Sequence, residues 1–180
     1  MPLQLYVNGT ELFDSERRMF IQVKPQKLVL EHSLISISKW EAKHHKMYLE
    51  TKDKTGLELL DYIKCMTING DVPDVVYYAL SEQNFNDILT YMEDPMTASS
   101  VYNPPRKNHQ ERVSSELIYY WMIQYGIPFE CEKWHINRLL MLINICSRKS
   151  STLSKADKQA MDQRRAAINA ERKAKLHTKG

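Results

Sequence analysis

Residues 114–145 decide the fold and read SSELIYYWMIQYGIPFECEKWHINRLLMLINI. Two apolar segments, residues 117–123 and 139–143, are separated by Gly126 and Pro128, which end one helix and prevent its continuation. The pattern therefore predicts two helices. Both are apolar on nearly all sides, so we expect them to be buried on more than one face. Neither segment reaches the roughly 18 apolar residues of a membrane span.

Polar residues mark where these two helices begin and end. Ser114 or Ser115 can cap the first helix through its hydroxyl group. The second helix is expected to begin within residues 130–133 and to end near residues 148–149, where cations suit the helix dipole. We predict that this central pair carries most of the core. Two of its side chains are expected to be almost fully buried, Trp121 and Leu140.

The first 31 residues have the alternating pattern of β-strands. Leucine and valine side chains alternate with other residues in residues 3–7, and Asn8-Gly9 is a typical hairpin turn. Two further short strands are expected at residues 20–23 and 28–30. Three short strands with one apolar face need another surface to cover them, so we expect this sheet to pack on helices.

Residues 32–149 show helical spacing with recognisable capping residues. Thr55 and Glu58 form a capping box, and the helix that follows is expected to end at residues 69–71. Pro73 can start a short helix, Ser81 can cap the next one, and Asp94-Pro95 can end it. Residues 103–108 read NPPRKN, which is typical of an exposed loop.

The composition changes after residue 149. Residues 148–180 contain ten lysines or arginines and three acidic residues, so the other 147 residues hold fifteen basic and nineteen acidic ones. An alanine-rich, basic helix is therefore predicted to project from a mildly acidic body. The fold class predicted is α+β and predominantly α-helical, with a small N-terminal antiparallel sheet packed on a helical body. The regions are residues 1–31, 32–149 and 150–180.

Residues able to carry chemistry are few. Cys131 and His135 lie four apart on one helix face, but zinc needs three or four ligands and the sequence has no second pair at metal spacing. A buried thiol beside a hydrogen-bonded histidine is therefore the better explanation. Glu130, Glu132 and Asp61 could supply paired carboxylates, although the sequence does not bring them together. Phosphate-binding glycine loops and nucleophile elbows are absent from the sequence. We therefore expect no enzyme activity, metal or cofactor.

The basic segment after residue 149 has three interpretations that the residues leave open. It could bind nucleic acid through phosphates, dock on an acidic protein, or remain a solvated tail. Coupling of folding to binding favours a protein partner, because a short helical arm can then make weak, reversible contacts. The residues expected to make them are Arg164, Arg165, Arg172, Lys173 and Lys175.

Several strings in the sequence resemble a family of tailed-bacteriophage morphogenesis proteins, among them tail assembly chaperones. They are LEHSLISISKWE at residues 30–41, DYIKCMTI at 61–68, IYYWMI at 118–123, IPFEC at 127–131, KWHINRLL at 133–140 and NAERK at 169–173. The resemblance spans nearly the whole chain. It implies a non-catalytic protein that binds the long helical tape measure protein, keeping it soluble while tail tube subunits polymerise around it.

The resemblance also implies a location. Such chaperones work in the host cytoplasm, which agrees with three scattered cysteines and an N-terminus without export features. The expected partners are the tape measure and tail tube proteins, with a possible homo-oligomer, and neither nucleic acid nor membrane. The alternative is a structural virion protein of the capsid, head-tail connector or tail, which would stay in the particle.

A truncation tests the predicted division of the chain. Residues 150–180 offer few large apolar side chains, so a chain that ends at Lys149 is expected to fold with an unchanged melting temperature. Circular dichroism and thermal denaturation measure this. A truncated chain that lacks cooperative unfolding would show that the basic segment belongs to the core.

Overall fold

The structure is a computed structural model and describes residues 1–99 and 112–149. The chain divides into two compact units, Met1–Met141 and Leu142–Gly180. Of the second unit the structure describes residues 142–149, which are helical. The loop predicted at residues 103–108 and the basic helix predicted after residue 149 lie outside the described residues. So do the five predicted binding residues, Arg164, Arg165, Arg172, Lys173 and Lys175.

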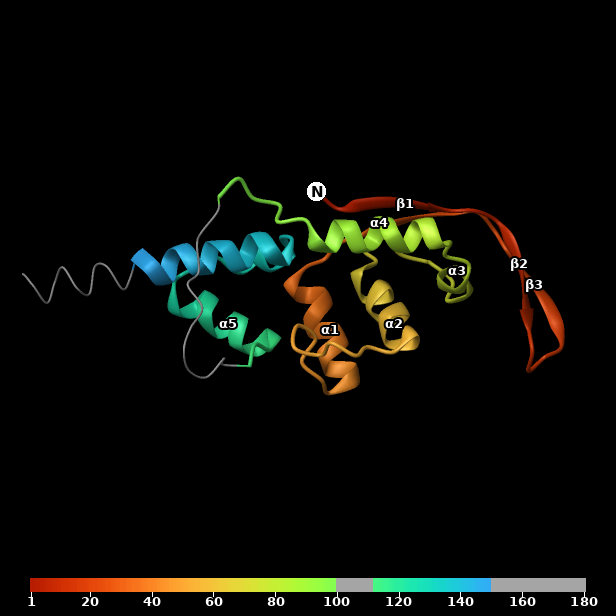
Figure 1. Cartoon of the computed structure of the whole chain (residues 1–180), viewed down its shortest axis with the longest axis horizontal. Coiled ribbons are helices and arrows are strands. Elements are labelled where there is room, and N and C mark those ends of the chain that lie inside the picture. The colour runs from red at the N-terminus through yellow and green to blue at the C-terminus, as the bar shows by residue number, and fades with distance from the viewer. Residues whose placement is uncertain (100–111, 150–180) are drawn as a thin grey trace, which may run out of the picture. The chain divides into compact units, whose positions relative to one another are not determined.

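The N-terminal strands form two antiparallel pairs along one two-stranded ribbon (Figure 1). Strand β1 (Leu3–Val7) pairs with β4 (Gln26–Leu30), and β2 (Thr10–Asp14) pairs with β3 (Met19–Val23). The sequence predicted three strands, whereas the described residues form four.

The prediction of a hairpin turn at Asn8-Gly9 is wrong. The turn comprises residues 15–18, where Asp14 Oδ1 accepts hydrogen bonds from the backbone N–H groups of Glu16 at 2.9 Å and Arg17 at 3.1 Å. This side-chain bonding stabilises a turn locally. Gly9 instead lies where the ribbon is interrupted, and a Cβ atom there would come within 2.9 Å of the Pro25 ring. The glycine is needed for this close approach.

The β1–β4 pair packs on helices. Leu5, Val7, Leu28 and Leu30 are buried, and α4 (Glu82–Glu93) lies against β1. The outer edge of β4 is bonded by the chain after α2, because Glu31 N–H donates to Met66 O at 2.8 Å and Ile68 N–H donates to Val29 O at 2.9 Å. The predicted α+β class, with a small antiparallel sheet on a helical body, is confirmed.

The remaining helices mostly begin where the capping residues predicted. They are α1 (Leu34–His44), α2 (Gly56–Met66), α3 (Val75–Tyr78) and α5 (Ser115–Gln124), followed by the 3-10 helix η1 (Phe129–Lys133). Thr55 forms its capping box with Glu58, Ser81 caps α4, and Ser114 caps α5.

Two helix boundaries differ from the predictions. Helix α2 ends at Met66, where Thr67 donates both its N–H and its hydroxyl to Ile63 O, so it stops before residues 69–71. The second helix of the central pair begins at residue 136, because η1 ends at an extended Trp134.

The core is centred on α1. Leu34, Ile37 and Trp40 of this helix are fully buried, and α2 contributes Tyr62 and Ile63 beside it. The two helices lie side by side in Figure 1. The indole N–H of Trp40 donates to Glu58 O at 2.9 Å, which satisfies its one polar atom inside the core.

The predicted burial of Trp121 and Leu140 is wrong, because both are half-buried. The fully buried side chains of α5 are Ile118 and Met122. The sequence of a helix that is apolar on all sides does not reveal which side faces the core. The size of the indole ring did not indicate that Trp121 would be buried.

A buried carboxylate joins α1 to α5. Glu41 Oε1 accepts a hydrogen bond from Tyr48 N–H and Glu41 Oε2 accepts one from Ser115 N–H, each at 2.8 Å. The second bond satisfies a backbone donor in the first turn of α5, where intrahelical acceptors are lacking. One side chain thus connects α1, the loop that follows it and α5.

Two tryptophan substitutions locate the core experimentally. Trp40→Ala is expected to lower the free energy of unfolding by about 4 kcal/mol, because it removes a fully buried ring. Trp121→Ala is expected to cost less than half as much, since that ring is partly solvated. Urea denaturation of both variants measures the difference, and equal losses would contradict this placement of the core.

Candidate functional site

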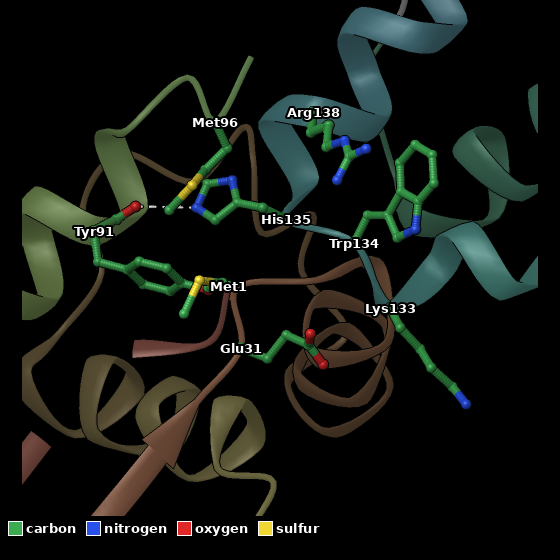
Figure 2. Close-up of a pocket in the computed structure, with 8 residues that line it drawn as sticks. All are labelled: Met1, Glu31, Tyr91, Met96, Lys133, Trp134, His135 and Arg138. Carbon is green, nitrogen blue, oxygen red and sulfur yellow. Dashed lines mark hydrogen bonds between the residues drawn. The ribbon is translucent and has the colours of Figure 1, made fainter. Parts of the chain in front are cut away.

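An open pocket of about 150 Å³ lies on the unit formed by residues 1–141. Its residues come from four separate parts of the chain: the N-terminus, the residue after β4, the end of α4 with the loop after it, and the end of η1 with the residues that follow it. Figure 2 shows them together: Met1, Glu31, Tyr91, Met96, Lys133, Trp134, His135 and Arg138.

Backbone pairing brings these distant segments together. Ser33 forms an antiparallel bridge with His135, and Ile136 N–H donates to His32 O at 2.8 Å. The chain leaving β4 therefore runs beside the chain leaving η1. Asn137 adds a link to the end of α4, because its side-chain amide donates to Met92 O at 3.0 Å.

His135 at the pocket is held as a neutral ring. Its Nε2–H donates to Tyr91 O at 3.0 Å, a contact drawn in Figure 2, and its Nδ1 accepts from Asn137 N–H at 3.3 Å. Burial lowers the pKa of His135, which further favours the neutral form. Both ring nitrogens are engaged, so neither is available to accept a proton from a bound molecule.

A polar cluster is buried next to His135. His32 Nδ1 lies 2.5 Å from the hydroxyl of Tyr62, and the His32 and His135 rings are 5.1 Å apart. Tyr62 also stacks on Tyr48, with ring centres 3.7 Å apart. Burial, with a smaller contribution from the nearby His135, lowers the pKa of His32 to about 3. The cluster is sealed from solvent, so it supports the fold.

The accessible part of the pocket carries both signs of charge. Glu31 is the acidic residue, and burial raises the pKa of its carboxyl group. Arg138 is a basic residue, and its guanidinium lies 4.0 Å from the centre of the Trp134 ring. Figure 2 shows this Arg138–Trp134 pair at one side, with Lys133 extending away from the centre. Such a surface can bind a mixed polar and aromatic group through hydrogen bonds and stacking.

The residues singled out in the sequence do not converge. Cys131 is buried, and His135 bonds as described above; the described part of the chain holds no group of three His, Cys, Asp or Glu residues that could bind a metal. Glu132 accepts a hydrogen bond from the Tyr119 hydroxyl at 2.9 Å, whereas Asp61 pairs with Lys43 at 2.7 Å. Glu130 is exposed. The expectation that the protein binds no metal stays a prediction.

Local patterns in the sequence do not reveal the pocket. Of its eight residues only His135 was a candidate, and Glu31, Tyr91 and Arg138 carried no signal of their own. Trp134 and Arg138 are four residues apart, and this spacing indicates a helix but no binding site. The pocket depends on pairing between residues about 100 positions apart, so no local pattern predicts it.

The described surface also has exposed apolar side chains outside the pocket. Tyr120 and Ile123 on α5 are 57% and 65% exposed, and they lie three residues apart on one helix face. Phe13, Met19 and Phe20 are exposed on the β2–β3 hairpin. Exposed apolar groups gathered on one element often mark binding sites.

The buried histidine predicts how stability depends on pH. An unfolded histidine has a pKa of about 6.5, so between that value and about 3 the unfolded chain binds a proton that folded His32 does not. Stability therefore falls as the pH falls through this window, by about 1.4 kcal/mol per pH unit from this residue. His32→Gln removes this titrating group. It is expected to reduce the slope of unfolding free energy against pH by the contribution of one proton, about 1.4 kcal/mol per pH unit.

Urea denaturation at several pH values measures that slope. Tyr62→Phe is the matched control, because it removes the hydrogen bond of Tyr62 to His32 but keeps the buried histidine. It is expected to lower stability while retaining the slope. A slope that His32→Gln leaves unchanged would show that folded His32 is protonated.

None of the helices in residues 1–99 and 112–149 is long and apolar enough to cross a membrane. Comparison of the chain with protein-family models, with curated proteins and with solved structures gave no significant match.

Proposed function

We propose that this chain is a bacteriophage tail assembly chaperone, which binds the tape measure protein in the host cytoplasm during tail morphogenesis and catalyses no reaction. The proposal begins from the resemblance to that family, which is carried mainly by residues 30–41, 61–68, 118–123, 127–131 and 133–140. The structural observation that supports it most is the exposed apolar face of α5.

Helix α5 offers a surface suited to a helical partner. Ile118 and Met122 are fully buried and anchor the helix, while Tyr120 and Ile123 point to solvent. A helical client can bury its own apolar side chains against such a face, with anchors spaced three or four residues apart. A repeated helical client would present many equivalent segments, which suits weak and reversible binding.

The chemistry of the pocket favours binding over catalysis. His135 has both ring nitrogens engaged, and His32 is sealed against Tyr62. Of the other lining residues, Lys133 and Arg138 are exposed, and Glu31 and Trp134 are half-buried. These can contact a polar or aromatic side chain, but they do not form a nucleophile with an adjacent base.

The basic segment supplies the second part of the proposal. Its positive charges would contact acidic residues of the client, with an affinity that falls as the salt concentration rises. The residues proposed for this are Arg164, Arg165, Arg172, Lys173 and Lys175. Mass spectrometry of purified virions separates the chaperone from the alternative, a structural virion protein, because a chaperone leaves before the particle is complete.

Charged substitutions on α5 test the proposed client surface. Tyr120→Asp with Ile123→Asp is expected to weaken binding to the co-expressed tape measure protein about tenfold, as for the loss of interface anchors. The soluble fraction of the tape measure protein and its recovery with the tagged chain are the measurements. Leu89→Asp on α4 is the matched control, because Leu89 is another exposed apolar residue on a helix.

Reversing the charges of Arg164, Arg165, Arg172 and Lys173 tests the basic segment in the same assay. Reduced client solubility in both the α5 and the basic-segment variants would support two contacts. If neither variant reduces it, or if the wild-type chain does not raise client solubility, the chaperone proposal is wrong.

A further inference from the structure

The β2–β3 hairpin, residues 10–23, extends away from the helices of its unit, and we call it the arm (Figure 1). Its apolar side chains lie on both faces. Phe13 and Phe20 form a cross-strand pair on one face, with ring centres 5.2 Å apart and exposures of 59% and 65%. Leu12 pairs with Ile21 on the other face. A two-stranded ribbon of this kind is marginally stable alone.

The backbone edges of the arm differ from those of the β1–β4 pair. The outer edge of β4 is bonded to residues 66–69, and Tyr6 O on β1 accepts from the Asn84 side chain at 3.3 Å. Among the described residues, no hydrogen bond reaches the outer edge of β2 or of β3. Both edges of the arm are therefore open to another strand.

The two halves of the arm have opposite charges. Residues 10–16 contain Glu11, Asp14 and Glu16 with no lysine or arginine. Residues 17–24 contain Arg17, Arg18 and Lys24 with no acidic residue. We call the β2 side, which carries Glu11 and is followed by Glu16 in the turn, the acidic edge. The β3 side has no charged residue within the strand, but Arg18 and Lys24 flank it at its two ends, and we call it the basic edge.

We propose that the arm is a self-association element, in which β3 of one copy of this chain pairs edge to edge with β2 of the next copy. This antiparallel contact places the basic edge against the acidic edge, whereas pairing β2 with β2 or β3 with β3 would bring like charges together. In the same register as the hairpin, the Phe13–Phe20 pair continues as a ladder across copies. A second copy therefore satisfies the open backbone groups, the exposed rings and the charges at once.

The contact is heterologous, since two different edges meet. Such contacts add copies until the rotation closes a ring, or continue into a filament. An isologous contact, in contrast, stops at a dimer. The wild-type chain is expected to form species larger than a dimer as its concentration rises, and these species are expected to dissociate at high salt.

Two charge-reversed variants test the pairing. Variant A carries Glu11→Lys and Glu16→Lys, which make both edges basic; variant B carries Arg18→Glu and Lys24→Glu, which make both acidic. The ion pair between Asp14 and Arg17 in the turn is kept in both variants. Each variant alone is expected to have an apparent dissociation constant at least about tenfold higher than wild type in sedimentation velocity.

A mixture of the two variants is the decisive sample. The basic β3 edge of A fits the acidic β2 edge of B, and the acidic β3 edge of B fits the basic β2 edge of A, so mixing is expected to restore association. Pairing of β2 with β2 predicts instead that B alone associates like wild type, and pairing of β3 with β3 predicts the same for A alone. Either result would overturn the proposal.

A control and a folding measurement complete the test. Glu82→Lys with Glu93→Lys on α4 changes the net charge as variant A does, away from the arm, and is expected to associate like wild type. Circular dichroism checks that each variant is folded. A wild-type chain that stays monomeric at all concentrations, or association that neither A nor B weakens, would exclude the arm as the contact.

Discussion

The buried carboxylate of Glu41 is the interaction on which the arrangement of the first unit depends. A carboxylate loses much hydration free energy when it is buried, and here two short hydrogen bonds from backbone N–H groups offset that cost. The Ser115 donor belongs to the first turn of α5, where the helix dipole also favours a negative charge. The Glu41 side chain therefore fixes the start of α5 against α1, while the buried Ile118 and Met122 anchor the rest of that helix. The segment after α5 leads to η1 and from there to the pocket.

Local chemistry explains what the sequence could predict. Thr55, Ser81 and Ser114 each bond to backbone groups within three residues, so the starts of α2, α4 and α5 follow from short strings. The same holds for the end of α5 at Gln124, which is followed two residues later by Gly126, whose φ of +63° is readily adopted by glycine. The α+β class followed from the change between alternating and helical spacing near residue 31.

The errors arose where distant residues decide the outcome. Asn8-Gly9 is a strong local turn signal, but Asp14 makes the turn and Pro25 makes the glycine necessary. The burial of Trp121 depended on which side of α5 meets α1. The pocket depends on the bridge between Ser33 and His135, and the sequence of neither segment predicts that pairing. The basic residues after residue 149 are outside the described part of the chain, so their role in binding a partner stays a prediction.

The close approach of Gly9 to Pro25 has a consequence for how this ribbon can vary. A side chain at position 9 would collide with the pyrrolidine ring, and relief would require a smaller or differently oriented residue at position 25. The two positions are thus constrained as a pair, and the effect of a change at one depends on the residue at the other. Because proline also lacks a backbone donor, the strand ladder is interrupted at this point. The ribbon therefore has a joint there, and bending at the joint requires no hydrogen bond of either strand pair to break.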